Sequence, residues 1–165
     1  MTTENVDEKK LRTDQEVANS EESGEYDATQ TTKEKRILIV EDSEYKYREV
    51  VVLLNKYNLI NYVHTTTIGK SFFECMKGEQ PVDIIILDMQ FPNSLNEPIN
   101  PNAGIKFIYK LEWNYRHERL KEIPHIIGFS SEDFYNGSKE LPKEFIGQGD
   151  TIYKVEEILK KILCL

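Results

Sequence analysis

Polar side chains that follow apolar runs are the residues best placed to do chemistry in this sequence. They are Glu41, Asp42, Asp88, Ser130 and Lys154. Three carboxylates brought together repel one another unless a cation neutralises them. Hard oxygen ligands in this number suit Mg²⁺, which prefers octahedral oxygen coordination completed by water and by substrate phosphate. The residue types therefore indicate a magnesium site that handles a phosphoryl group.

Asp88 is the best candidate for a nucleophile because it ends the most apolar run, Ile84–Leu87. A carboxylate can attack phosphorus and form an acyl phosphate when positive charge offsets its repulsion by the phosphoryl oxygens. Asp42, assisted by Glu41, is expected to hold the metal together with Asp88, and the backbone carbonyl of Gln90 is a further expected ligand.

The two remaining polar residues suit the phosphoryl oxygens. Lys154 would pair with one oxygen as a point charge, and the hydroxyl of Ser130 would donate a hydrogen bond to another. Taken singly, each of these residues could have a purely structural role, as a helix cap or at the start of a helix. Their joint occurrence at successive strand ends favours a functional site.

Elements that position these residues alternate along the chain. Short β-branched and apolar runs predict strands, and each is followed by apolar residues at helical spacing. The expected strands are Ile37–Val40, Tyr62–Ile68, Val82–Leu87, His125–Phe129 and Thr151–Tyr153. About five helices alternate with them, the weakest between Asp133 and Phe145, where Gly137 and Pro142 interrupt the pattern.

This alternation predicts an α/β fold, with a five-stranded parallel sheet covered by helices on both faces in the flavodoxin-like manner. Ligands of such sheets bind outside the carboxyl ends of the strands. All five polar residues are expected at that edge.

Composition limits both the extent of the fold and its partners. Residues 1–35 are polar and acidic and predict a disordered tail, whereas residues 36–165 suffice for one domain. The net charge of −8 argues against direct binding to nucleic-acid phosphates.

The sequence shows no signal peptide and no apolar run of membrane-spanning length, so we expect a cytoplasmic protein without membrane insertion. Two cysteines do not indicate a disulfide framework or a zinc site.

Four stretches resemble the receiver domain of two-component response regulators. The matching residues are 37–43, 85–89, 125–131 and 147–154, and the resemblance covers 36–165. It implies Mg²⁺-dependent phosphoryl transfer from a histidine kinase or histidine phosphotransfer protein to Asp88, followed by hydrolysis of the acyl phosphate. It also implies that Ser130 moves toward the phosphoryl group and alters a surface that binds a downstream protein. Because the last expected helix reaches the end of the sequence, we expect a single-domain response regulator.

The chain departs from the receiver pattern in three places. Val155 stands where a proline usually follows the lysine, and Thr151 stands where an aromatic residue is common. The segment 93–103, before the glycine matched by Gly104, is longer than the usual connection. That segment would either shape partner choice or be a tolerated surface insertion.

Other functions fit the sequence less well. The main alternative is a receiver-like interaction module that works without phosphorylation, which the missing proline and aromatic residue favour. A haloacid-dehalogenase type of hydrolase would need an acid at Gln90, and a flavodoxin-like cofactor binder would need a glycine-rich loop after the first strand. A receiver would catalyse its own phosphorylation and dephosphorylation, so a dedicated turnover enzyme is not indicated.

Overall fold

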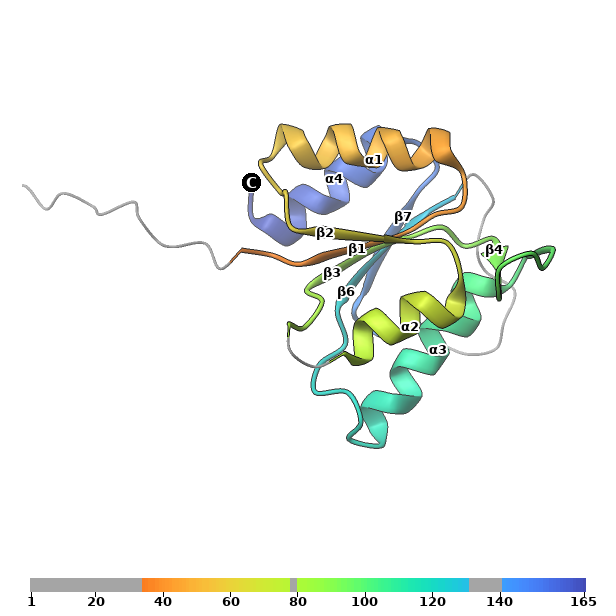
Figure 1. Cartoon of the computed structure of the whole chain (residues 1–165). Helices are drawn as coiled ribbons and strands as arrows, with labels where there is room; N and C mark the ends of the chain where they lie inside the picture. The colour runs from red at the N-terminus through yellow and green to blue at the C-terminus, as the bar shows by residue number, and fades with distance from the viewer. Residues whose placement is uncertain (1–33, 78–79, 131–140) are drawn as a thin grey trace, which may run out of the picture. The chain divides into compact units, whose positions relative to one another are not determined.

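A computed structural model of the chain describes residues 34–77, 80–130 and 141–165. The expected tail, up to residue 33, and most of the weakly predicted helix after Asp133 lie outside these residues. Within the described residues, five parallel strands form one sheet in the order β2-β1-β3-β6-β7 (Figure 1). The strands are β1 (Ile37–Val40), β2 (Tyr62–Thr65), β3 (Ile84–Leu87), β6 (His125–Phe129) and β7 (Phe145–Gly149). The predicted α/β fold is confirmed.

Helices cover both faces of this sheet. They are α1 (Glu44–Lys56), α2 (Ile68–Met76), α3 (Ala103–Arg116) and α4 (Ile152–Leu163). Figure 1 shows α1 and α4 on one face and α2 and α3 on the other. Successive strand side chains point to opposite faces, so Ile84 and Ile86 pack under α1 and α4, whereas Ile85 and Leu87 pack under α2 and α3. Burial on both faces explains why β1 and β3 are continuously apolar.

The fifth strand lies earlier in the chain than the sequence predicted. The prediction of a strand at Thr151–Tyr153 is wrong, because the oxygen of the Thr151 side chain accepts from the backbone N–H of Lys154 and caps α4. The strand is instead Phe145–Gly149, which pairs with β6. A Cβ on Gly149 would lie 2.7 Å from the backbone nitrogen of Val155, so glycine permits the close approach of β7 to α4.

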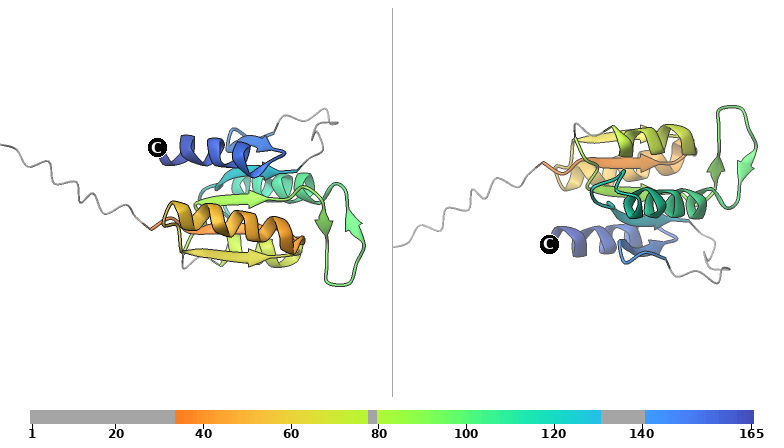
Figure 2. Two further views of the ribbon diagram at one scale, coloured as in Figure 1. Left: turned by 90° about the horizontal axis from the view of Figure 1, so that it is seen from above. Right: turned by 90° about the horizontal axis from the view of Figure 1, so that it is seen from below.

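The long connection after β3 contains a small antiparallel hairpin. Its strands are β4 (Phe91–Pro92) and β5 (Ile99–Asn100), and Figure 2 shows it extending beyond the edge of the sheet at which the strands end. Phe91 is fully buried at the base, and the Asn100 side-chain amide donates to Oδ1 of Asn93 at 2.7 Å. Asn96 has φ 67°, a left-handed conformation that asparagine tolerates in turns. The segment 93–103 thus consists of turns and of the strand Ile99–Asn100, whose pairing with Phe91–Pro92 ties the segment to the residues that follow Asp88.

A glycine sets the distance between α3 and the end of β3. The backbone N–H of Gly104 donates to the carbonyl of Met89 at 3.0 Å. A Cβ on Gly104 would lie 2.7 Å from the Met89 Cα and 3.2 Å from the Asp88 carbonyl oxygen. Only a residue without a side chain fits there, so Gly104 fixes the backbone around Asp88.

Among the described residues, we found no helix with the length and apolar character required to traverse a lipid bilayer.

Candidate functional site

Three carboxylates meet at the carboxyl edge of the central strands. Glu41 and Asp42 follow β1, and Asp88 follows β3. The two strands pair in register, Val40 with Leu87, so the residues after them emerge side by side. The backbone N–H of Asp88 donates to the Val40 carbonyl at 2.7 Å, which extends the pairing to the nucleophile candidate. One carboxylate oxygen from each acid lies within 4.8 Å of the others.

The burial of these acids differs. Glu41 and Asp88 are only 2% and 4% exposed, whereas Asp42 is exposed to solvent. Burial raises the pKa of Glu41 well above its usual range, and the negative charge of Asp88 raises it further. The pKa of Asp42 is raised by the same two causes. The pocket therefore disfavours its own full ionisation unless a cation is added.

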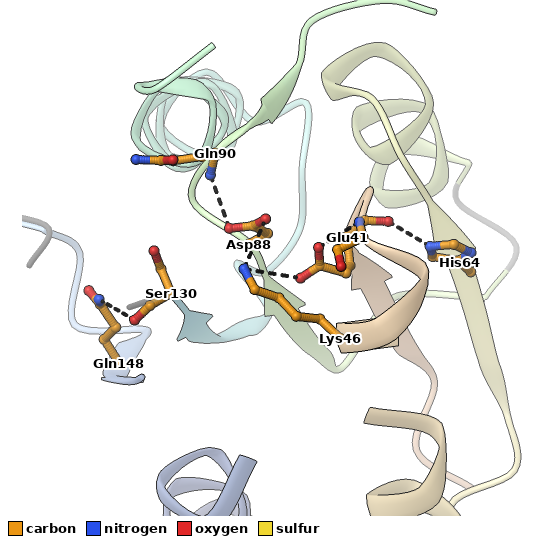
Figure 3. Close-up of polar contacts among 8 residues, drawn as sticks. Glu41, Lys46, His64, Asp88, Gln90, Ser130 and Gln148 are labelled. Carbon is orange, nitrogen blue, oxygen red and sulfur yellow. Dashed lines mark hydrogen bonds and ion pairs between the residues drawn. The ribbon is translucent and has the colours of Figure 1, made fainter. Parts of the chain in front are cut away.

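Backbone groups orient the two buried acids. Oε1 of Glu41 accepts from the Ser43 backbone N–H at 2.8 Å, and Oδ1 of Asp88 accepts from that of Gln90 at 3.1 Å (Figure 3). Nε2 of His64 lies 2.7 Å from the Glu41 carbonyl oxygen and fixes the backbone there. Ser43 is the N-cap position of α1, but its side chain makes no capping hydrogen bond. The other carboxylate oxygen of each acid, Oε2 of Glu41 and Oδ2 of Asp88, faces Lys46.

Lys46, which sequence reasoning did not predict, forms ion pairs with two of the pocket acids. Its Nζ lies 3.4 Å from Oδ2 of Asp88 and 3.8 Å from Oε2 of Glu41 (Figure 3). Lys46 comes from the first turn of α1, and its side chain reaches back over the strand ends. A signal was available: a lysine in the first turn is disfavoured by the positive end of the helix dipole, which suggests a compensating partner.

Lys154 does not take part in this cluster. It lies in the first turn of α4, where its Nζ pairs with Oδ1 of Asp150 at 2.9 Å and 59% of its side chain is exposed. Among the described residues, it makes no ion pair with any of the three pocket acids. The lysine belongs to a helix turn and not to the end of a strand, and its expected contact with a phosphoryl oxygen stays a prediction.

Ser130 directly follows β6, which pairs with β3, and is 4% exposed. It is linked to β7 through the backbone. Its N–H donates to the Gly149 carbonyl at 3.0 Å, and Nε2 of Gln148 donates to the Ser130 carbonyl at 3.1 Å (Figure 3). The structure therefore places the predicted hydroxyl residue at the expected strand end and connects it to the adjacent strand.

The residues of the pocket fit a magnesium ion. Ligand oxygens on an octahedral Mg²⁺ are separated by up to about 4.2 Å, because each lies 2.0–2.1 Å from the ion. The three carboxylate oxygens lie within 4.8 Å of one another, so they form a single oxygen cluster that would close around the ion when it binds. Oε2 of Glu41 is buried and has no hydrogen-bond partner among the described residues. A buried oxygen of this kind is a suitable metal ligand.

Comparisons with known proteins identify the fold. No protein-family model and no curated protein matches the chain. The structure is similar to the N-terminal domain of a response regulator/sensory box/GGDEF three-domain protein from Carboxydothermus hydrogenoformans, with a TM-score of 0.50, 18% identity, and coverage of 79% of this chain and 94% of that chain. It is also similar to a CheY-like response regulator receiver domain from Methylobacillus flagellatus, with a TM-score of 0.52, 16% identity, and coverage of 78% and 98%. The chain has the fold of a receiver domain.

Proposed function

We propose that this chain is a response-regulator receiver that accepts a phosphoryl group on Asp88. The observation that carries the proposal is the cluster of Glu41, Asp42 and Asp88 at the carboxyl edge of a receiver-type sheet. Ligands of parallel α/β sheets bind at that edge. The proposal extends to residues 36–165 as the receiver and to a cytoplasmic location.

Asp88 would supply the reacting atom. A carboxylate oxygen of Asp88 attacks phosphorus and forms a P–O bond, while the P–N bond of the donor phosphohistidine breaks and its electron pair stays on the imidazole nitrogen. The donor would be a histidine kinase or a histidine phosphotransfer protein. The hydrogen bond from Gln90 to Oδ1 of Asp88 holds the carboxylate during this approach. Attack by water later releases phosphate.

A magnesium ion would be held by Glu41, Asp42 and Asp88, and we retain the Gln90 carbonyl as a proposed fourth ligand. When bound, such an ion neutralises negative charge on the acids and on the phosphoryl oxygens. In the structure, Gln90 contacts Asp88 through its N–H, so its carbonyl role rests on the sequence prediction.

Ser130 would transmit the signal. Its hydroxyl is proposed to donate to a phosphoryl oxygen on Asp88, which requires the Ser130 backbone to shift. Because that backbone is hydrogen-bonded to Gly149 and Gln148, a shift would be passed to β7 and on to α4, which packs against β7. The output would be a changed protein-binding surface, and the net charge of −8 disfavours nucleic acid as its direct partner.

An interaction module that works without phosphorylation is the second candidate. Lys46 favours it, since an ammonium already faces Asp88 and Glu41. The position of Lys154 also favours it, because the expected phosphoryl-contacting lysine pairs with Asp150 instead.

Phosphotransfer from a donor protein separates the two candidates. The chain is incubated with a radiolabelled phosphohistidine protein, and the label is then challenged with hydroxylamine, which cleaves acyl phosphates and leaves phosphate esters intact. A receiver takes up label that hydroxylamine removes, and Ser130→Ala still takes it up. Failure to take up label from a panel of donors, or label that resists hydroxylamine, contradicts the proposal.

A further inference from the structure

Lys46 makes contacts that would conflict with a bound divalent cation. Its Nζ lies 3.4 Å from Asp88 Oδ2 and 3.8 Å from Glu41 Oε2. Both acids are among the three whose oxygens cluster within 4.8 Å. Figure 3 shows the Lys46 ammonium joined to both carboxylates, those of Glu41 and Asp88. The ammonium thus faces the same oxygens that a metal would need.

Two effects oppose the position of the Lys46 ammonium beside the acids, and its surroundings offset them. The first turn of a helix repels positive charge, and partial burial also disfavours an ammonium. Only 30% of the Lys46 side chain is exposed, and its Nζ lies 5.5 Å from the centroid of the Phe129 ring. Attraction to two nearly buried carboxylates, together with the ring face, offsets these costs.

We infer that Lys46 is a resident counter-cation that competes with the divalent metal for the acidic pocket. This inference rests on the proposed function for the identity of the pocket but concerns a different property of it. Like charges at such short range repel strongly, so metal binding and the inward position of Lys46 exclude each other. Binding of the metal would move Lys46 outward, toward the solvent that it already contacts. Lys46 therefore lowers the affinity of the pocket for a divalent metal.

Metal titration of matched variants tests this inference. Mn²⁺ serves as the probe in isothermal calorimetry on the full chain. Lys46→Gln removes the charge and keeps a hydrogen-bond donor, and Lys46→Arg keeps the charge. Lys161→Gln removes a comparable charge from an exposed position in the last turn of α4. We expect Lys46→Gln to bind Mn²⁺ about tenfold more tightly or better, and Lys46→Arg and Lys161→Gln to match the wild type. Equal or weaker binding by Lys46→Gln overturns the inference, and so does undetectable binding by every form.

A second measurement uses the wild-type chain and guards against a variant that fails to fold. The lysines are acetylated with a limiting amount of an amine-reactive acetylating reagent, with and without Mn²⁺. The modified sites are then mapped by mass spectrometry. Acetylation of Lys46 should accelerate when Mn²⁺ is present, while that of the exposed Lys161 stays constant. Slower or unchanged modification of Lys46 overturns the inference. Neither readout requires phosphoryl transfer, so tighter metal binding by Lys46→Gln together with no phosphorylation would reject only the proposed function.

Discussion

Glu41 has the most strained electrostatic position among the pocket acids. It is almost fully buried, one oxygen accepts from Ser43, and the other faces Lys46 without a hydrogen-bond partner among the described residues. Burial, reinforced by Asp88, raises its folded-state pKa above the unfolded value of 4.5 to about 8. Between these two values the folded chain binds more protons at Glu41 than the unfolded chain does. The contribution of this residue to stability therefore falls as the pH rises through that range.

Replacing Glu41 by glutamine should remove this pH dependence. In the absence of divalent metal, we expect Glu41→Gln to gain stability relative to the wild type on going from about pH 5 to about pH 8, by up to about 3 kcal/mol. Urea denaturation at both pH values measures the free energy of unfolding. Glu44→Gln is the matched control, because Glu44 is an exposed residue of α1 paired with Arg48 at the surface. A constant difference between Glu41→Gln and the wild type at both pH values would contradict the account.

The packing of α3 against β3 is the element contact that most directly shapes the site. A Cβ on Gly104 would lie 2.7 Å from the Met89 Cα, next to Asp88. Gly104→Ala should therefore displace α3 or the end of β3 and lower the free energy of unfolding by about 1–3 kcal/mol. Gly69→Ala in α2 is the control, since a Cβ there meets nothing within 4 Å, and alanine favours helix. Urea denaturation compares the two, and equal stability of both variants would show that the close approach is unimportant.

Some strands could be predicted from the sequence and others could not. The strands β1, β3 and β6 were recognisable because each is an apolar run buried on both faces, and their order placed Glu41, Asp42 and Asp88 at one edge. β7 was misplaced because it contains Gly147 and Gly149 and has little local strand character; its pairing with β6 is a tertiary effect.

Because β7 was predicted at Thr151–Tyr153, Lys154 was expected at the end of a strand. Thr151 precedes the final helical pattern and could have been recognised as an N-cap, which would have assigned Lys154 to the helix. Lys46 escaped notice for a different reason. A helix residue that reaches back over a strand end depends on how α1 packs on the sheet, and periodicity does not report that distance.

At the scale of the whole molecule, the described residues contain a five-stranded sheet with an apolar core on each face. Residues 1–33 carry few apolar side chains, so we propose that they add little to the stability of the described sheet. We expect deletion of residues 1–33 to change the thermal midpoint by less than about 2 °C. Differential scanning calorimetry of the full and shortened chains measures this. A substantially lower midpoint in the shortened chain would assign the N-terminal segment a structural role.

Phosphorylation of Asp88 is the central claim, and intact mass after incubation with acetyl phosphate tests it most directly. Wild type, Asp88→Asn and Asp150→Asn are compared with and without Mg²⁺, the last variant being a control because Asp150 pairs with Lys154 on α4 and not with the pocket. The account predicts a gain of one phosphoryl group in the wild type and in Asp150→Asn, only with Mg²⁺, and no gain in Asp88→Asn. An equal gain in Asp88→Asn, or no gain in the wild type with Mg²⁺, would contradict it.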